Sequence, residues 1–417
     1  MKWPAIVGLV MIASLFAGAC RESGSDSFET RPLPPELEQM LAEIAGLRGL
    51  DPPSALEAGT VSRLDVPALL DRELTDADRR WFTRTTTLYR LLGHLGPDED
   101  YLSVFRDFGA GAIVGLYSPV SNRLWVVQGE PPIDLDAMSP PERSALAHEL
   151  VHAIQDYHFA LDELSLRTAA DLDWSMAATA VIEGDAVTHQ GLWDARQLAL
   201  PGGTRLFLGT HGAGGSTPPS IERELRFPYT TGAEWVNIVR SEEGTAAIDH
   251  YLAGEPISTA HILHPELRKT GWQPERVVLP ELGAALGEGW SRESGGTFGE
   301  FHLRNYLQLG LPALPSVQAA SGWRGDRYDV YVRADSAVAV FRVRFADAVE
   351  AEEFAAAQRD MLAPAGAEAP PGGRFVAELR DGRTTIQLSS PDASEVLFVV
   401  GSTREAAELA ARAVVNA

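Results

Sequence analysis

Residues 147–154, Ala-His-Glu-Leu-Val-His-Ala-Ile, are the stretch from which the fold and the chemistry of this chain are best predicted. A helix advances about 3.6 residues per turn, so His148 and His152 would lie on one face, a single turn apart. Two imidazoles so placed can bind one zinc ion, and Glu149 beside them can take a proton from a water on that ion. The stretch therefore predicts a zinc site on a helix.

The residues before this stretch favour a helix that begins just ahead of it. Ser139-Pro140-Pro141-Glu142 fits a capping box with Pro at the first helical position. Residues 143 to about 159 then have the apolar spacing of a buried helix. The alternative is a plain core helix with two hydrogen-bonded histidines and an exposed Glu149.

A hydrolytic zinc site needs a third protein ligand and one open position. Glu183 is our candidate, on a second long helix expected from about residue 168 to 200, which would run antiparallel to the first. A carboxylate among Ala, Val and Ile residues is costly to bury unless it is paired or bound to a metal. Asp185 and His189 are rival ligands, and Glu183 could also be an ordinary surface residue of an amphipathic helix.

The two stretches 147–156 and 183–186, which read AHELVHAIQD and EGDA, resemble a group of poorly characterised bacterial exported proteins. That group is regarded as zinc metallopeptidases of the gluzincin type. The resemblance implies His148, His152 and Glu183 as zinc ligands, with Glu149 as the base. It extends over most of the chain through residues 115–119, 227–232, 256–265 and 322–328.

The chain departs from well-studied gluzincins at Val187, where those enzymes often have an Asp that orients a zinc-binding histidine. Gln155 and Asp156 are candidates to replace it. A hydrolase also needs a donor for the developing oxyanion, and the candidates are Tyr229, His261 and His264. We expect His264 to be the catalytic one, because it lies in a run shared with the similar group; it could equally be bonded within its own loop.

The N-terminus indicates export. Residues 4–19 are apolar but short for a membrane span, and they precede Cys20, the only cysteine. We expect residues 1–19 to be a lipoprotein signal and Cys20 to carry the lipid, with residues 20–36 as a polar tether. The protein would then be a bacterial membrane-anchored lipoprotein facing the periplasm or the cell surface. An ordinary cleaved signal or a single membrane span are the alternatives.

Composition fits a globular chain of two or three domains, since 45% of the 417 residues are hydrophobic and 22% are charged. The net charge is −23, and no basic run occurs, which argues against nucleic acid as a partner. A single cysteine also excludes an intramolecular disulfide.

We predict an α+β fold with a zincin-like, mainly helical domain over residues 37–320. Helices are expected at 36–47, 75–95, 98–108, 233–241 and 244–252, while 259–267 is undecided between helix and turns. Strands at 112–117 and 123–127 would form a hairpin ahead of the zinc helix. The hairpin could pair with an extended substrate or be purely structural.

Residues 322–417 are expected to form a small α+β domain without a metal cluster. The predicted strands are 328–332, 337–344, 375–379, 384–388 and 395–400, and the predicted helices are 348–362 and 403–414. They would make an antiparallel sheet with helices on one face.

Two functions are compatible with these expectations. The first is a lipid-anchored, extracytoplasmic zinc metallopeptidase that cleaves a peptide or protein substrate, with Glu149 as general base. The second is a non-catalytic surface lipoprotein, a binding or scaffold protein with a structural or vestigial zinc site. A structural site should have a fourth protein ligand. The sequence does not name the substrate.

Overall fold

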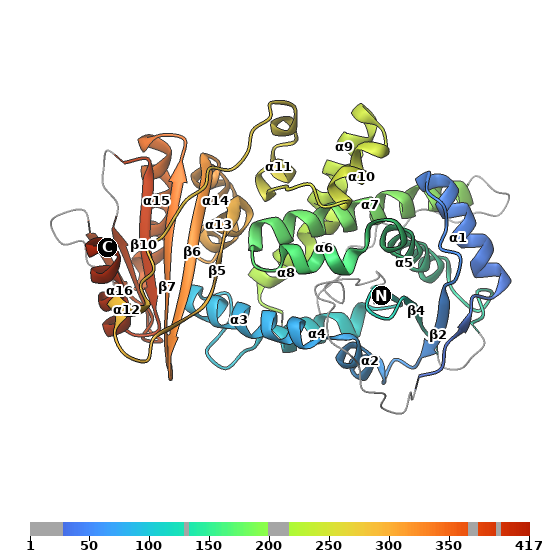
Figure 1. The fold of residues 1–417 in the computed structure, drawn as a ribbon, viewed down its shortest axis with the longest axis horizontal. Helices are drawn as coiled ribbons and strands as arrows, with labels where there is room; N and C mark the ends of the chain where they lie inside the picture. Colours follow the sequence, from blue (N-terminus) through green and yellow to red (C-terminus); the bar gives the residue numbers. More distant parts are fainter. Residues whose placement is uncertain (1–27, 129–132, 199–216, 366–373, 389–392) are drawn as a thin grey trace.

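The computed structural model describes residues 28–128, 133–198, 217–365, 374–388 and 393–417. It confirms the α+β class: helices predominate, and two separate sheets lie at opposite ends of the molecule, with most of the helices between them (Figure 1). Within the described residues, no helix combines the length and the apolar character needed to cross a membrane.

The smaller sheet lies beside the predicted zinc helix. Its strand order is β1-β2-β4-β3, with β1 at Arg31–Pro32, β2 at Glu57–Val61, β4 at Arg123–Val127 and β3 at Gly115–Ser118. The expected hairpin is confirmed as the antiparallel pair β3–β4. The parallel pairing of β2 with β4 joins segments distant in sequence, which local pattern could not reveal. Strand β3 is left at the edge of the sheet.

Among the described residues, four helices precede the zinc helix: α1 at Pro35–Arg48, α2 at Val66–Glu73, α3 at Asp76–Leu92 and α4 at Tyr101–Ala112. Thr75 caps the N-terminus of α3, because its hydroxyl accepts a hydrogen bond from the Asp78 N–H. Helix α4 runs four residues beyond the expected end, into the stretch assigned to a strand. Helix α1 packs against the two long helices at Pro140–Phe159 and Leu172–Leu198, and it buries Leu37 and Ile44.

The central pair is α5 at Pro140–Phe159 and α7 at Leu172–Leu198, separated by the short helix α6 at Leu161–Thr168. Ala160 has a φ of 50°, a left-handed conformation that ends α5 and turns the chain into α6. The second long helix therefore begins later than expected. Its antiparallel return along α5 follows from the short connection.

The chain then continues through a series of shorter elements. They are α8 at Pro219–Phe227, the π-helix η1 at Pro228–Gly232, α9 at Ala233–Glu243, α10 at Ala246–Leu252, α11 at Thr259–Leu263, the 3-10 helix η2 at Pro265–Lys269, α12 at Gly283–Leu286, α13 at Gly299–Leu307 and α14 at Ala313–Ala320. Of these, η1, α9, α10, α11 and α13 pack against α7. The undecided stretch 259–267 is thus part α-helix and part 3-10 helix.

The larger sheet is antiparallel throughout, in the order β5-β6-β7-β10-β9-β8. Its strands are β5 at Ser291–Gly296, β6 at Trp323–Arg333, β7 at Ser336–Phe345, β8 at Arg374–Glu378, β9 at Thr384–Leu388 and β10 at Glu395–Gly401. Two helices pack on this sheet. They are α15 at Ala348–Leu362, which is followed by the 3-10 turn η3 at Ala363–Ala365, and α16 at Arg404–Asn416. Strand β5 precedes the expected domain start at residue 322.

The expectation that helices cover one face of this sheet is wrong. Side chains alternate along a strand, and on β7 Val340 packs with α16 whereas Phe341 packs with α15. Each face therefore has its own helix. The Phe341 face also shares a continuous core with Leu88 of α3, so the sheet and the helical part are packed together.

The part of the expected tether that the structure describes is packed onto the fold. Phe28 lies edge-on to Trp125, with ring centroids 5.8 Å apart, and Leu33 is buried under α1. Strand β1 pairs with β2. Residues 20–27 lie outside the described residues, as do the signal segment and Cys20.

Candidate metal centre

Helix α5 carries the two histidines through the interior of the protein. Pro140 occupies its first turn, and Glu142 accepts hydrogen bonds from the Ser139 N–H and hydroxyl, as the capping-box pattern predicts. Every residue from 144 to 155 is buried. His148 and His152 are therefore sealed from solvent, with ring centroids 4.7 Å apart.

Glu183 on α7 completes a group of three converging ligand atoms. Its Oε2 lies 3.0 Å from the His148 Nε2 and 3.4 Å from the His152 Nε2, and the two Nε2 atoms are 3.1 Å apart. The three residues are the one His, Cys, Asp and Glu group within the described residues whose ligand atoms converge enough to hold a metal ion. The expected ligand set is brought together, and this group could hold a metal ion.

Glu183 and the two histidines shift one another's pKa values. Burial alone would raise the pKa of Glu183, but the histidines beside it lower that pKa to about 2. Burial lowers the pKa of His148. Burial acts in the same direction at His152, but the charge of Glu183, its hydrogen bond and the charge of Glu149 together raise the pKa of that ring. Glu183 is therefore held as a carboxylate facing two imidazoles, the ionisation state in which a carboxylate binds metal.

Glu149 lies beside the group and is held by the edge strand. Its Oε2 accepts a hydrogen bond of 2.8 Å from the Tyr117 N–H of β3, while its Oε1 is buried with no partner in the described structure. Burial raises the pKa of Glu149 to about 8. Gly115 permits the close approach, because a Cβ there would lie 3.1 Å from the Glu149 Cγ.

Tyr229 reaches the group from the π-helix η1. Its ring stacks on His148, and its buried hydroxyl interacts with Glu183 and has no other hydrogen-bond partner within the described residues. Burial, and then the charges of Glu183 and Glu149, raise the pKa of Tyr229 well above its usual value. Isolated π-helical turns are frequent at functional sites.

Two glycines allow η1 to pack closely against α7, the helix that carries Glu183. A Cβ on Gly184 would overlap the backbone of Gly232, and a Cβ on Gly232 would overlap the carbonyl of Ala180. The small residues Ala180 and Gly184 of α7 therefore allow close packing against η1.

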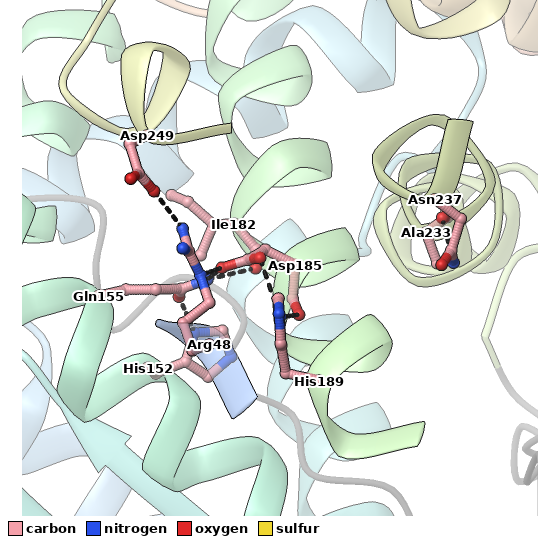
Figure 2. Close-up of polar contacts among 9 residues, drawn as sticks. All are labelled: Arg48, His152, Gln155, Ile182, Asp185, His189, Ala233, Asn237 and Asp249. Atoms are coloured by element: carbon pink, nitrogen blue, oxygen red, sulfur yellow. Dashed lines mark hydrogen bonds and ion pairs between the residues drawn. The ribbon is translucent and has the colours of Figure 1, made fainter. Parts of the chain in front are cut away.

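A second layer of residues lies behind the ligands, and Figure 2 shows the part of it that backs His152. Gln155 accepts from the His152 Nδ1 at 2.7 Å and donates to Asp185, so one of the two expected orienting residues has that position. The other, Asp156, instead accepts from the Tyr117 hydroxyl. The rival ligands Asp185 and His189 contact each other behind the ligand layer.

The remaining histidine candidates are not brought into this group. His264 ends α11, and its Nε2 lies 2.9 Å from Glu300 and 3.2 Å from Arg304, both on α13. The two ring nitrogens of His261 contact the Ser258 N–H and the Trp272 carbonyl. Among the three proposed oxyanion donors, Tyr229 is the one in contact with a ligand.

Two residues of the second layer were not anticipated. Gln190 lies 3.2 Å from the His148 Nδ1, and its position seven residues after Glu183 on the same helix face could have indicated it. Arg48 of α1 pairs with Asp185 across 137 positions of sequence, and nothing local marks it.

Comparison with known proteins gives one match. Residues 288–411 match a family model described as a domain of unknown function, DUF8575. This stretch covers the larger sheet and excludes α5, α7 and η1. No curated protein and no solved structure matches the chain.

Proposed function

We propose that the protein is a zinc-dependent metallopeptidase, anchored by a lipid and exposed outside the cytoplasm. The observation that carries the proposal is the position of Glu149. It is a fully buried carboxyl group with one oxygen fixed by the Tyr117 N–H and the other unpaired, next to three converging ligand atoms. A group in that position is suited to proton transfer.

The donor set supports zinc as the metal. Two imidazole nitrogens and one carboxylate oxygen are typical of catalytic zinc sites. Atoms about 2.0–2.1 Å from a tetrahedral ion lie about 3.4 Å apart, which is close to the separations of 3.0–3.4 Å between the three ligand atoms. Zinc would act as a Lewis acid toward the attacking water and the substrate carbonyl.

Glu149 would supply the proton transfers of peptide hydrolysis. As a carboxylate it takes a proton from the attacking water, whose oxygen forms a bond to the carbonyl carbon. It then delivers that proton to the amide nitrogen as the C–N bond breaks, which yields a carboxylate and an amine. Its pKa of about 8, raised by burial, suits a group that must both accept and release a proton.

Tyr229 would stabilise the oxyanion that develops on the carbonyl oxygen. Its hydroxyl is a donor that is not engaged elsewhere in the described structure, and stacking on His148 holds its ring at the site. A preorganised donor of this kind contributes strongly to acyl-transfer reactions. We therefore prefer Tyr229 to His264 for this role.

A peptide is the substrate class that the surroundings favour. Strand β3 is an edge strand, and the N–H of its residue Tyr117 already points at Glu149. All four residues of β3 are buried in the described structure, so an extended chain would have to enter beside α5 and take over the Tyr117 N–H. It would then bring its carbonyl groups next to the base. The net charge of −23 argues against nucleic acid. Anchoring through Cys20 and a periplasmic or cell-surface position rest on the sequence alone.

The alternative is a surface lipoprotein with a structural zinc site. Such a site would be closed by a fourth protein ligand. In the described part of the chain the group has three members, with Asp185 and His189 turned to each other. That arrangement favours the catalytic proposal.

The test measures bound zinc and peptide cleavage in the full chain and in Glu149→Gln. Glu224→Gln is the matched control, since Glu224 is equally buried but bonded to Tyr89 and Tyr101. We expect zinc in all three proteins and cleavage of a peptide library in all except Glu149→Gln. Zinc binding without cleavage by the native protein would favour the structural alternative, and absence of zinc binding would refute both.

A further inference from the structure

Each metal-binding histidine is backed by a glutamine. The His152 Nδ1 lies 2.7 Å from the Oε1 of Gln155, and the His148 Nδ1 lies 3.2 Å from the Oε1 of Gln190. A carboxylate or carbonyl in this position would accept from the ring N–H whatever its surroundings. A glutamine amide can present either its oxygen or its NH2 group, so something else must decide which end faces the histidine.

At His152 the deciding atoms are acceptors on α7. The Gln155 Nε2 donates to the Ile182 carbonyl at 3.0 Å and to the Asp185 Oδ2 at 2.8 Å. Both partners offer lone pairs and no proton, so the NH2 end of Gln155 faces them. Its oxygen is thereby turned to the His152 Nδ1, which must be the donor of that hydrogen bond.

Arg48 fixes the same order of donors and acceptors at Asp185, the next residue of the hydrogen-bond chain. Its guanidinium has only donors, and its Nε lies 2.8 Å from the same Asp185 Oδ2 that accepts from Gln155 (Figure 2). Arg48 is the last residue of α1, is 2% exposed, and also pairs with Asp249 of α10. The Asp185 Oδ2 that faces Arg48 therefore has to accept, and Gln155 can approach this atom only with its NH2 group.

We propose that Arg48 sets the tautomer of His152 through Asp185 and Gln155. The alternation of donor and acceptor along this chain keeps a proton on Nδ1, so that Nε2 is the nitrogen left to bind a metal ion. Arg48 is thus a positioning residue of the metal centre, which makes α1 part of the site. This inference rests on the proposed metal-binding function.

The second glutamine provides an internal control. Gln190 donates to the Ser144 hydroxyl at 2.9 Å, and Ser144 donates to Asp194 at 2.7 Å. The His148 tautomer is therefore ordered by a separate chain of hydrogen bonds that does not include Arg48. A change in the Arg48 chain should alter His152 and leave His148 as it was.

The variants follow from the same polarity rule. In Asp185→Asn the amide oxygen should turn to Arg48, because Arg48 still requires an acceptor, and the polarity at Gln155 should persist. In the double variant Arg48→Met with Asp185→Asn, the side chain at position 185 is free to present either end. Removing both charges together avoids leaving a buried charge unpaired, so the double variant should fold. Gln155→Met removes the partner of His152 directly.

The experiment is long-range 1H–15N NMR of the full chain labelled with 15N-histidine and freed of metal, followed by titration with zinc. We expect the Nδ1–H tautomer at His152 in the native protein and in Asp185→Asn. A mixture of tautomers is expected in the double variant and in Gln155→Met, with zinc affinity lowered about 10-fold to 100-fold. His148 should keep the same tautomer in all four proteins.

Two results would overturn the inference. One is a native protein in which His152 carries its proton on Nε2. The other is a double variant that keeps the Nδ1–H tautomer while Gln155→Met loses it, since the Ile182 carbonyl would then orient Gln155 without Arg48. Both readings are made without metal or substrate, so they are independent of whether the protein proves to be a peptidase.

Discussion

The ring of Tyr229 lies against the imidazole of His148, with centroids 5.9 Å apart and planes inclined by 25°. This contact joins the π-helix η1 to the metal helix α5. The hydroxyl of Tyr229 lies at the ligand group because Gly184 and Gly232 allow η1 to pack closely on α7. The first two predictions test this arrangement.

Tyr229→Phe should lower kcat on a cleaved peptide by about 100-fold to 1,000-fold, as removal of an oxyanion donor does elsewhere. Zinc content and KM should change little, because the ring and its contact with His148 remain. Steady-state kinetics with metal analysis checks this. His264→Gln is the comparison, and a larger loss of kcat there than in Tyr229→Phe would return the oxyanion role to His264.

Gly184→Ala should destabilise the protein by about 1–3 kcal/mol, because an added methyl group overpacks the contact with Gly232. It should also lower activity by displacing Tyr229. Gly191→Ala on the same helix is the matched control, since a Cβ there meets no atom within 4 Å. Denaturant unfolding should give equal or higher stability for Gly191→Ala, and equal losses in both variants would contradict the tight contact.

The stability of the protein should depend on pH through Glu224. Burial raises the pKa of this carboxyl to about 7, although Tyr89 and Tyr101 donate to it. Between about pH 4.3, the unfolded value, and pH 7 the unfolded state releases the proton that the folded state keeps. The free energy of unfolding contributed by Glu224 therefore falls as pH rises through this window. Relative to the native protein, the free energy of unfolding of Glu224→Gln should rise by up to about 4 kcal/mol between pH 4 and pH 8, and parallel unfolding curves would contradict the shift.

Removal of metal should lower the thermal midpoint of the protein. Binding to the folded state alone stabilises by about 2.7 kcal/mol at a free metal concentration 100 times the Kd. Calorimetry with chelator and with added zinc measures the difference. Glu183→Gln should lose most of this zinc-dependent gain, whereas Glu149→Gln should keep it, because Glu149 is not among the three ligands.

Much of the architecture could be predicted because it is local. A capping box and a Pro at the first turn mark the start of α5, and period-two alternation marks β7 and β10. The ligand group followed from the spacing of His148 and His152 and from a carboxylate that needed a partner. These signals depend on neighbours in sequence, which is why they could be read without the fold.

The rest depends on contacts between distant segments. Arg48 is an ordinary arginine at the end of an amphipathic helix until α1 docks against α7. The π-helical turn that carries Tyr229 has no sequence pattern separate from that of α8 and α9, between which it is inserted. The expectation of His264 rests on the run shared with the similar group, and no local pattern indicates that η1 packs on Gly184 and brings Tyr229 to the metal group.

The shared core between α3 and the larger sheet bears on how the protein can be dissected. Phe341 and Phe398 stack in parallel at 4.5 Å, and the cluster they belong to extends to Leu88 of α3. A fragment that began at residue 288 would leave this apolar surface facing water. We expect such a fragment to self-associate, so that recombinant production for crystallography or binding assays must retain the helices upstream of the sheet.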